Sequence, residues 1–237
     1  MQFSKIIDPN WPAPKKIKVY SVTRNFFNNI NEKDNNINAA RSYLISNLET
    51  LGITKTKIHN IKQCHGIKAI QVPPTNNTSH IADGIYTKQK GEICSVYTAD
   101  CMPIVITNNT GSFVSIIHVG WKGLYNNFIS TFISSISINP NSCIAWIGPS
   151  ISQKFYSVDK LFYKCFVSKN KEYGKFFIKV KGKYYFSLQD SAIYQFNRAQ
   201  VKQVFVSNLC TYDNNNLFFS YRKNKTLMRF PTLAWIE

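Results

Sequence analysis

Short apolar runs, separated by Gly, Pro, Asn and Thr, dominate the hydrophobic pattern of this chain. Runs of β-forming residues predict strands at residues 17–22, 57–61, 69–72, 93–98, 104–107, 113–119, 143–147, 204–207, 217–221 and 233–236. The lysine-rich residues 176–186 are typical of a β-hairpin. The asparagine-rich residues 28–36 contain few apolar side chains and indicate a loop. A sheet of some size is therefore expected.

Helical spacing of apolar residues marks four other segments. From Ala40 to Leu51 the apolar residues fall on one face and Gly52 follows, which predicts an amphipathic helix with a packing role. Residues 124–136, 158–167 and 188–200 predict three more helices. No fixed-period repeat and no Pro- or Ser-rich linker divides the chain. We therefore expect one domain over residues 1–237, an α/β (α+β) fold with mixed β-sheets flanked by helices.

Charge is the most unusual property of the composition. The 237 residues include 29 Lys plus Arg against 12 Asp plus Glu, a formal net charge of +17, and 44% are hydrophobic. The hydrophobic content excludes intrinsic disorder for most of the chain. The cations favour nucleic-acid binding, but the lysines are scattered, and abundant Asn, Lys, Ile, Tyr and Phe match the codons of an A+T-rich genome. Nucleic acid is therefore only a secondary candidate partner.

Membrane insertion and disulfide bonding are not expected. No run approaches the ~18 apolar residues of a membrane span, and residues 1–9 lack the apolar core of a signal peptide, so we expect a cytoplasmic protein. Six scattered cysteines without a CxxC pair indicate free thiols, of which Cys64, Cys94 and Cys143, in apolar contexts, are expected in the core.

Three motifs place chemically active side chains at the ends of predicted strands. His65 lies in Gln-Cys-His-Gly, Cys101 in Thr-Ala-Asp-Cys-Met-Pro, and His118 in His-Val-Gly-Trp-Lys-Gly. A Gly or Pro beside each lets a loop turn the side chain into a cleft. Spacing this wide has no local geometric signature, so from the pattern alone a metal site, a catalytic site and ordinary packing all stay open. His59 and His80 lack such motifs and are expected at the surface or in loops.

These motifs, with Ala-Asp at 82–83, Ile-Gly-Pro at 147–149 and Phe-Phe-Ser-Tyr-Arg-Lys at 218–223, resemble the YfiH/laccase-domain family. The resemblance extends from about residue 11 to about residue 235. Members are described as polyphenol oxidase, purine nucleoside phosphorylase and adenosine deaminase. The resemblance implies a YfiH-like fold and a single zinc ion held by His65, Cys101 and His118. Three ligands leave a fourth position open, as in catalytic zinc sites.

Copper fits these residues less well than zinc. A multicopper oxidase needs on the order of ten histidines, and the chain has 4. A single copper with Met102 as axial ligand would require the adjacent Cys101 and Met102 to face the same side of a strand, against the alternation of strand side chains.

The resemblance also implies chemistry on purine nucleosides. Phosphorolysis would convert adenosine, inosine or S-methyl-5′-thioadenosine to the free base and (methylthio)ribose 1-phosphate, with adenosine deamination as a second activity. Asp83 and Asp100 occupy motif positions and are candidates for acid/base catalysis, or for orienting a metal-bound imidazole. Arg24 is a further catalytic candidate, because phosphate needs fixed cations to position it.

Four other residues are candidates for binding substrate or phosphate: Gln63, Lys122, Arg222 and Arg229. Lys122 stands where the family usually has Arg, Leu-Met-Arg at 227–229 replaces the usual Thr-Gly-Arg, and the region 25–36 is shorter than in the family. These departures leave the zinc ligands intact and the choice of substrate open.

Two alternatives remain from other functional classes. The first is a cysteine hydrolase acting on peptidoglycan precursors, with Cys101 as nucleophile and His118 as its base. The second is a basic nucleic-acid-binding module without turnover. For each of them, as for the phosphorylase, a monomer or a small homo-oligomer is expected.

Overall fold

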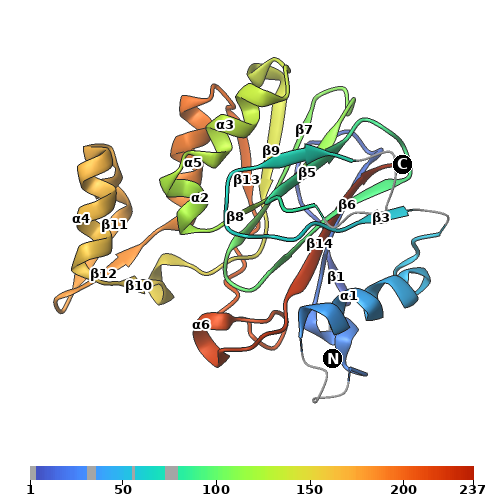
Figure 1. Cartoon of the computed structure of the whole chain (residues 1–237), viewed down its shortest axis with the longest axis horizontal. Coiled ribbons are helices and arrows are strands. Elements are labelled where there is room, and N and C mark those ends of the chain that lie inside the picture. Colours follow the sequence, from blue (N-terminus) through green and yellow to red (C-terminus); the bar gives the residue numbers. More distant parts are fainter. Residues whose placement is uncertain (1–3, 31–35, 55–56, 73–79) are drawn as a thin grey trace.

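Two β-sheets lie at the centre of the molecule (Figure 1). The computed structural model describes residues 4–30, 36–54, 57–72 and 80–237. The order of the first sheet is β1 (Ile6–Ile7), β2 (Ile17–Val22), β14 (Phe230–Ile236), β6 (Glu92–Thr98) and β3 (Lys57–His59). The order of the second is β13 (Gln203–Val206), β9 (Cys143–Ile147), β7 (Met102–Asn108), β8 (Val114–Val119), β5 (Gly84–Thr87) and β4 (Ala69–Gln71). Both sheets combine parallel and antiparallel pairs.

Apolar side chains from both sheets pack against each other. Val19 and Val96 from the first sheet belong to the same buried cluster as Val105 and Ile116 from the second. Strand alternation gives each sheet a second apolar face. Because both faces of β7, β8, β9 and β14 are covered, every residue in these strands is buried, and their sequences read as nearly continuous apolar runs.

Helices cover the outer face of each sheet, giving a helix–sheet–sheet–helix arrangement (Figure 1). Over the first sheet lie α1 (Ile37–Ser46) and the 3-10 helices η1 (Arg24–Phe27) and η3 (Leu48–Leu51). Over the second lie α2 (Trp121–Tyr125), α3 (Phe128–Ser135) and α5 (Leu188–Arg198). The predicted α/β class, with mixed sheets flanked by helices, is confirmed.

A smaller lobe projects at the left of Figure 1. Its sheet has the order β10 (Ser157–Val158), β12 (Lys183–Phe186) and β11 (Phe177–Val180), and α4 (Lys160–Lys169) packs on it. Stacked rings such as Tyr163 and Tyr184, with centroids 4.4 Å apart, hold the helix to the hairpin. The remaining short elements are η4 (Pro140–Ser142), η5 (Gln153–Phe155), η6 (Lys171–Phe176) and α6 (Tyr221–Asn224).

Two predicted elements differ from the structure. The single helix predicted at residues 124–136 is two helices, α2 and α3, because Asn127 adopts a left-handed conformation (φ 55°) between them. The strand predicted at residues 217–221 is wrong. Phe218 is fully buried there, but its backbone N–H bonds to Asn214 in a turn, and Ser220 already caps α6. The apolar pattern here reflects the burial of Phe218 and Phe219 and not pairing with another strand.

Other differences are smaller. The helix predicted from residue 40 to 51 is α1 followed by η3, and it ends at Gly52 as expected (φ 73°). Residues 31–35 of the predicted loop lie outside the described residues. His59 is not at the surface: it is buried in β3 beside the carboxylate of Glu92. Cys94 and Cys143 are buried as predicted, whereas Cys64 is exposed. Within the described ranges, no helix is both long and apolar enough to cross a membrane.

Candidate metal and substrate site

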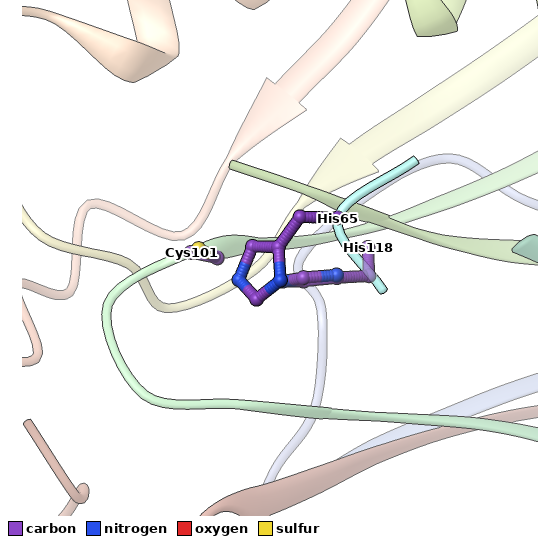
Figure 2. Close-up of side chains that lie close together, drawn as sticks. All are labelled: His65, Cys101 and His118. Carbon is purple, nitrogen blue, oxygen red and sulfur yellow. The ribbon is translucent and has the colours of Figure 1, made fainter. Parts of the chain in front are cut away.

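Three segments that are distant in sequence bring the predicted ligands together. His65 lies in the turn between β3 and β4, Cys101 in the turn between β6 and β7, and His118 near the end of β8. Their ligand atoms all lie within 4.8 Å of one another, and Figure 2 shows the three side chains side by side. His118 is buried, Cys101 is partly buried and His65 is exposed. The group is therefore open to solvent on the His65 side.

Asp83 fixes the position of both histidines from behind. Its Oδ1 accepts hydrogen bonds from His118 Nδ1 (2.8 Å) and from the backbone N–H of His65 (2.9 Å). Its Oδ2 accepts the N–H groups of Gly66 (2.6 Å) and Cys64 (3.2 Å). Because Nδ1 of His118 is engaged, Nε2 is the atom left to bind a metal ion. This carboxylate is fully buried, and its hydrogen bonds fix the orientation of both histidines.

Opposing charges shift the pKa values in this group. Burial raises the pKa of Asp83, but hydrogen bonds from His118 and Gly66 outweigh it and hold the pKa well below its ordinary value. Burial also raises the pKa of Cys101, yet the charges and hydrogen bonds of His118 and His65 lower it to about 6. Burial lowers the pKa of His118, whereas Cys101 and Asp83 raise it to about 9. Cys101 is thus a thiolate near neutral pH, the form that binds metal ions.

Local packing also fits a metal ion. A Cβ atom at Gly120 would lie 2.7 Å from Cys101 Sγ, so only glycine lets β8 turn into α2 this close to the sulfur. Met102, the conceivable axial ligand of a copper site, is fully buried in the hydrophobic cluster between the second sheet and its helices. One thiolate and two imidazoles remain as donors, and this set can bind a metal ion.

A cavity of about 1030 Å³ opens beside these three residues. Its remaining lining consists of Ile37, Asn38, Arg41, Lys62, Gln63, Tyr97, Ala99, Asp100, Trp121, Tyr156, Tyr221, Arg222, Lys225 and Arg229. Five of these are cations, and among the described lining residues Asp100 is the single carboxylate. The cavity therefore attracts anions.

Four predicted substrate or acid/base residues line this cavity, and each already has protein partners. Both amide atoms of Gln63 bond to the backbone of Tyr97, at 2.8 and 3.0 Å. Arg222 donates from Nη1 to the carbonyl of Ser157 (2.7 Å), and Arg229 donates from Nη1 to backbone carbonyls at 2.8 Å.

Asp100 is the fourth, and its carboxylate is the most heavily engaged. Oδ1 accepts hydrogen bonds from the hydroxyls of Thr211 and Ser220, both at 2.7 Å, and Oδ2 accepts the backbone N–H of Arg222 at 2.6 Å. The residue has φ 90°, a strained value for a side chain with a Cβ. These bonds hold the turn that carries Cys101 against the start of α6.

Three predicted residues lie outside the cavity lining: Asp83, which lies behind the histidines, and the cations Arg24 and Lys122. Arg24 lies in a separate hollow with Phe219, whose ring is 5.4 Å from its guanidinium carbon, and it donates to the carbonyl of Asn215. Lys122 is exposed, with its ammonium 5.7 Å from the ring centroid of Trp121.

Sequence reasoning missed Arg41, Lys62, Tyr97, Tyr156 and Lys225, which also line the cavity. Arg41 belongs to the helix for which only a packing role was predicted, and that prediction is wrong because α1 also forms one cavity wall. An Arg beside the buried Ala40 of an amphipathic helix carries no sign of its function. A signal was available for two of these residues: Lys62 lies close to His65 in the sequence, and Tyr97 lies close to Cys101, each within four residues.

Comparison with known proteins decides the family. Residues 18–237 match the family model described as multi-copper polyphenol oxidoreductase laccase. The chain belongs to this laccase-domain family. It is 29% identical over 245 residues to the purine nucleoside phosphorylase YfiH of Escherichia coli, covering 98% of this chain and 99% of that protein. It is 31% identical over 215 residues to the purine nucleoside phosphorylase of Rickettsia conorii, covering 86% and 88% of the two chains.

Solved structures confirm the fold of the laccase-domain family. Neisseria meningitidis protein NMB0706 superposes with a TM-score of 0.88 at 24% identity, covering 99% of this chain and 100% of that one. YlmD from Geobacillus stearothermophilus superposes with a TM-score of 0.86 at 20% identity, covering 100% and 98%.

The family description names several copper ions, but the histidines here are too few for them. The chain has 4 histidines. One of them, His59 in β3, pairs with Glu92 at the start of β6. In the described part of the chain, one group of His, Cys and carboxylate side chains is close enough to share a metal ion. Over its described residues, this member of the laccase-domain family thus offers a single three-ligand site.

Proposed function

We propose that this protein is a zinc-dependent purine nucleoside phosphorylase. The proposal rests mainly on one juxtaposition: a His-Cys-His group that can bind a metal ion lies at the edge of a cationic, partly aromatic cavity. Relatives that align with nearly the full chain bear the name purine nucleoside phosphorylase. The substrates proposed are adenosine, inosine and S-methyl-5′-thioadenosine, with inorganic phosphate as the second substrate.

Zinc is the metal that suits these donors best. Zinc accepts both thiolate and imidazole ligands, and His65, Cys101 and His118 would hold the ion. The same three donors form a blue-copper site only with an axial ligand such as Met, and Met102 is buried in the hydrophobic cluster instead. When bound there, zinc would supply a Lewis acid with one open coordination position. Asp83 would keep His118 in the tautomer that presents Nε2.

The reaction requires an anion to meet a positively charged sugar carbon. A phosphate oxygen forms a bond to C1′ of the ribose as the C1′–N9 bond breaks, and the electron pair of that bond leaves with the purine. The proton of hydrogen phosphate ends on the purine, so the products are the neutral free base and ribose 1-phosphate. Cations such as Arg222, Arg229 and Lys225 would attract the phosphate dianion into the cavity, which raises its local concentration near C1′. The rings of Tyr156 and Trp121 offer faces on which a purine can stack.

Adenosine deamination is proposed as a second activity of the same cavity. Water would add at C6 of adenine, and ammonia would leave. Both candidate carboxylates, Asp83 and Asp100, already accept several protein hydrogen bonds. They therefore serve better as positioning residues than as carriers of the proton.

The proposal is tested with purified, zinc-loaded protein. Free adenine should form from adenosine only when phosphate is present, whereas inosine should form without phosphate. Cys101→Ala should abolish both reactions and lose the metal, as measured by elemental analysis. The exposed thiol of Cys165 provides a matched control, since Cys165→Ala should retain metal and turnover. No turnover of any purine nucleoside by the metal-loaded protein would refute the proposal.

One observation favours a second candidate, the cysteine hydrolase. Cys101, His118 and Asp83 form a thiolate–imidazole–carboxylate series like that of a nucleophilic triad. His65 argues against it, because a second imidazole beside the sulfur has no role in a triad but completes a metal site. Chelation separates the two functions: a nucleophilic Cys101 would stay active after metal removal, and the phosphorylase would not.

A further inference from the structure

The α1 wall of the cavity contains an arginine stacked on a tyrosine. The guanidinium carbon of Arg41 lies 5.1 Å from the ring centroid of Tyr97, and its Nη2 donates to the carbonyl of Ile61 (2.8 Å). Tyr97 lies on β6, where the side chain of Gln63 bonds to its backbone N–H and C=O. Gln63 is two residues from His65. The stacked pair is therefore held in a fixed position relative to the metal ligands.

Both members of the pair have an unused polar atom. Nε of Arg41 and the hydroxyl of Tyr97 are buried and have no hydrogen-bond partner among the residues that the structure describes. Tyr97 is 2% exposed, and it is one of the residues that line the cavity. Native proteins rarely leave such groups unpaired, because burial has already removed their hydration. A bound ligand is a natural partner for both.

The chemistry of the two groups defines that ligand. Arg41 Nε–H can only donate. Burial raises the pKa of Tyr97, more than the charge of Arg41 lowers it, so its hydroxyl stays protonated and can donate as well. Within the described residues no carboxylate is recorded as an ion-pair partner of Arg41. A partner that accepts two hydrogen bonds and carries negative charge satisfies both groups.

We propose that Arg41 and Tyr97 form an oxyanion subsite that receives inorganic phosphate, the second substrate of the proposed phosphorolysis. The choice of phosphate rests on the proposed function, whereas the two donors are features of the fold. Lys62, in the same wall, adds positive charge. Arg222 and Arg229, across the cavity, already use Nη1 for backbone carbonyls. They contribute attraction, while the Arg41–Tyr97 pair provides directed hydrogen bonds.

Calorimetric titration of the zinc-loaded protein with inorganic phosphate tests this assignment. Tyr97→Phe keeps the ring under Arg41 and removes one oxygen, and Arg41→Lys keeps the charge and removes Nε–H. Each should weaken phosphate binding by about tenfold to a hundredfold, the range for a hydrogen bond to a charged group. The KM for phosphate should rise in parallel, with the KM for nucleoside unchanged. Arg198 and Tyr194 form a similar pair on α5, outside this cavity, so Arg198→Lys and Tyr194→Phe are matched controls.

Thermal unfolding without phosphate supplies a second measurement. Tyr97→Phe should leave the melting temperature unchanged or raise it, because it removes an unpartnered buried hydroxyl. A clearly lower melting temperature would reveal a structural partner and overturn the proposal. Phosphate affinities within about twofold of wild type in both variants would overturn it too.

Titration with AMP distinguishes the source of the phosphate group. If AMP binding depends on the pair and inorganic phosphate binding does not, the subsite receives a phosphate ester and the proposal is wrong as stated. Because calorimetry needs no turnover, failure of the proposed function is seen separately. If the zinc-loaded protein is inactive but both variants lose phosphate binding, the proposed function fails and the subsite stands. If the protein is active but both variants keep the phosphate affinity of the wild type, the subsite fails and the proposed function stands.

Discussion

Asp83 is a buried carboxylate that fixes the positions of two of the three candidate metal ligands. It accepts hydrogen bonds from the imidazole of His118 and from consecutive backbone N–H groups at residues 64–66. The second set of bonds holds His65 in a left-handed conformation (φ 61°), which turns its ring toward Cys101. The positions of two candidate metal ligands therefore depend on one residue that lies behind both.

Replacing this carboxylate should weaken metal binding. In Asp83→Asn an NH2 group takes the place of one oxygen and cannot accept the N–H bonds made there. We expect zinc affinity to fall by about 10–100-fold, the range for losing an orienting partner of a metal ligand. Competition with a chromogenic chelator measures the affinity. The exposed Asp213 provides the control, because Asp213→Asn should bind zinc as the wild type does. Equal affinities for the two variants would contradict the role assigned to Asp83.

Among single residues, the motifs in the sequence predicted the three candidate ligands, and the Ala-Asp pair at 82–83 predicted Asp83. It could not supply Arg41 or Tyr97, because a single Arg on an amphipathic helix and a Tyr in a strand are common everywhere. Their meaning depends on two atoms being buried in the same cavity wall without partners. Burial of individual atoms is a property of the packed molecule.

Among the elements, the short helix α6 depends on a turn more than a hundred residues earlier in the chain. The hydroxyl of Ser220 accepts the N–H of Lys223 as the helix cap and donates to Asp100 (2.7 Å). Asp100 also accepts the N–H of Arg222. The same turn presents Cys101, so one carboxylate fixes this candidate metal ligand relative to Arg222 of α6.

Removing the cap of α6 should lower both stability and activity, whereas removing an equivalent cap elsewhere should lower stability alone. Ser220→Ala loses the capping bond and the bond to Asp100, and Ser187→Ala loses the equivalent two bonds at α5, to the N–H and carboxylate of Asp190. Both variants should lose about 1–2 kcal/mol of unfolding free energy in urea titrations. Only Ser220→Ala should also lower kcat/KM for phosphorolysis, by about tenfold, if the loss of transition-state stabilisation is about 1.4 kcal/mol. A similar loss of activity in Ser187→Ala would mean that α6 has no special place in the site.

The segment around α6 also shows where element prediction failed. Its Phe-Phe pair is buried, as a strand there would require, but Leu217 and Phe218 donate their N–H groups to Asn214 within a turn. Alternation and burial do not reveal which backbone groups are paired, and that pairing defines a strand. The same limitation hid the break at Asn127, since every apolar position of the predicted helix does pack on the second sheet.

On the scale of the molecule, the candidate metal site lies where the two sheets meet. Cys101 follows β6 of the first sheet, and His118 belongs to β8 of the second. A metal ion bound by both would link the two sheets at the edge of their shared hydrophobic cluster. Metal binding should therefore stabilise the whole fold and not a single loop.

Zinc should raise the melting temperature in a concentration-dependent manner. Free zinc at 100 times its dissociation constant adds about 2.7 kcal/mol, which corresponds to roughly 5–10 °C for a chain of this size. Differential scanning calorimetry with and without a chelator measures the shift. Cys101→Ala should abolish it, and Cys165→Ala, on the exposed surface of α4, should not. If zinc stabilises the Cys101→Ala protein equally, the metal binds elsewhere.

The sequence by itself determined the class of fold and the runs that form the buried strands, and its motifs, through their resemblance to the laccase-domain family, indicated the three candidate metal ligands and the carboxylate at 82–83. These are local properties, written in periodicity and in short motifs. Only the tertiary structure decided which cations lie near the candidate metal ligands. Of the 29 that give the chain its charge, Arg41, Lys62, Arg222, Lys225 and Arg229 converge on one cavity, while Arg24 and Lys122 lie outside its lining. Such convergence depends on packing between distant segments, which neither composition nor spacing records.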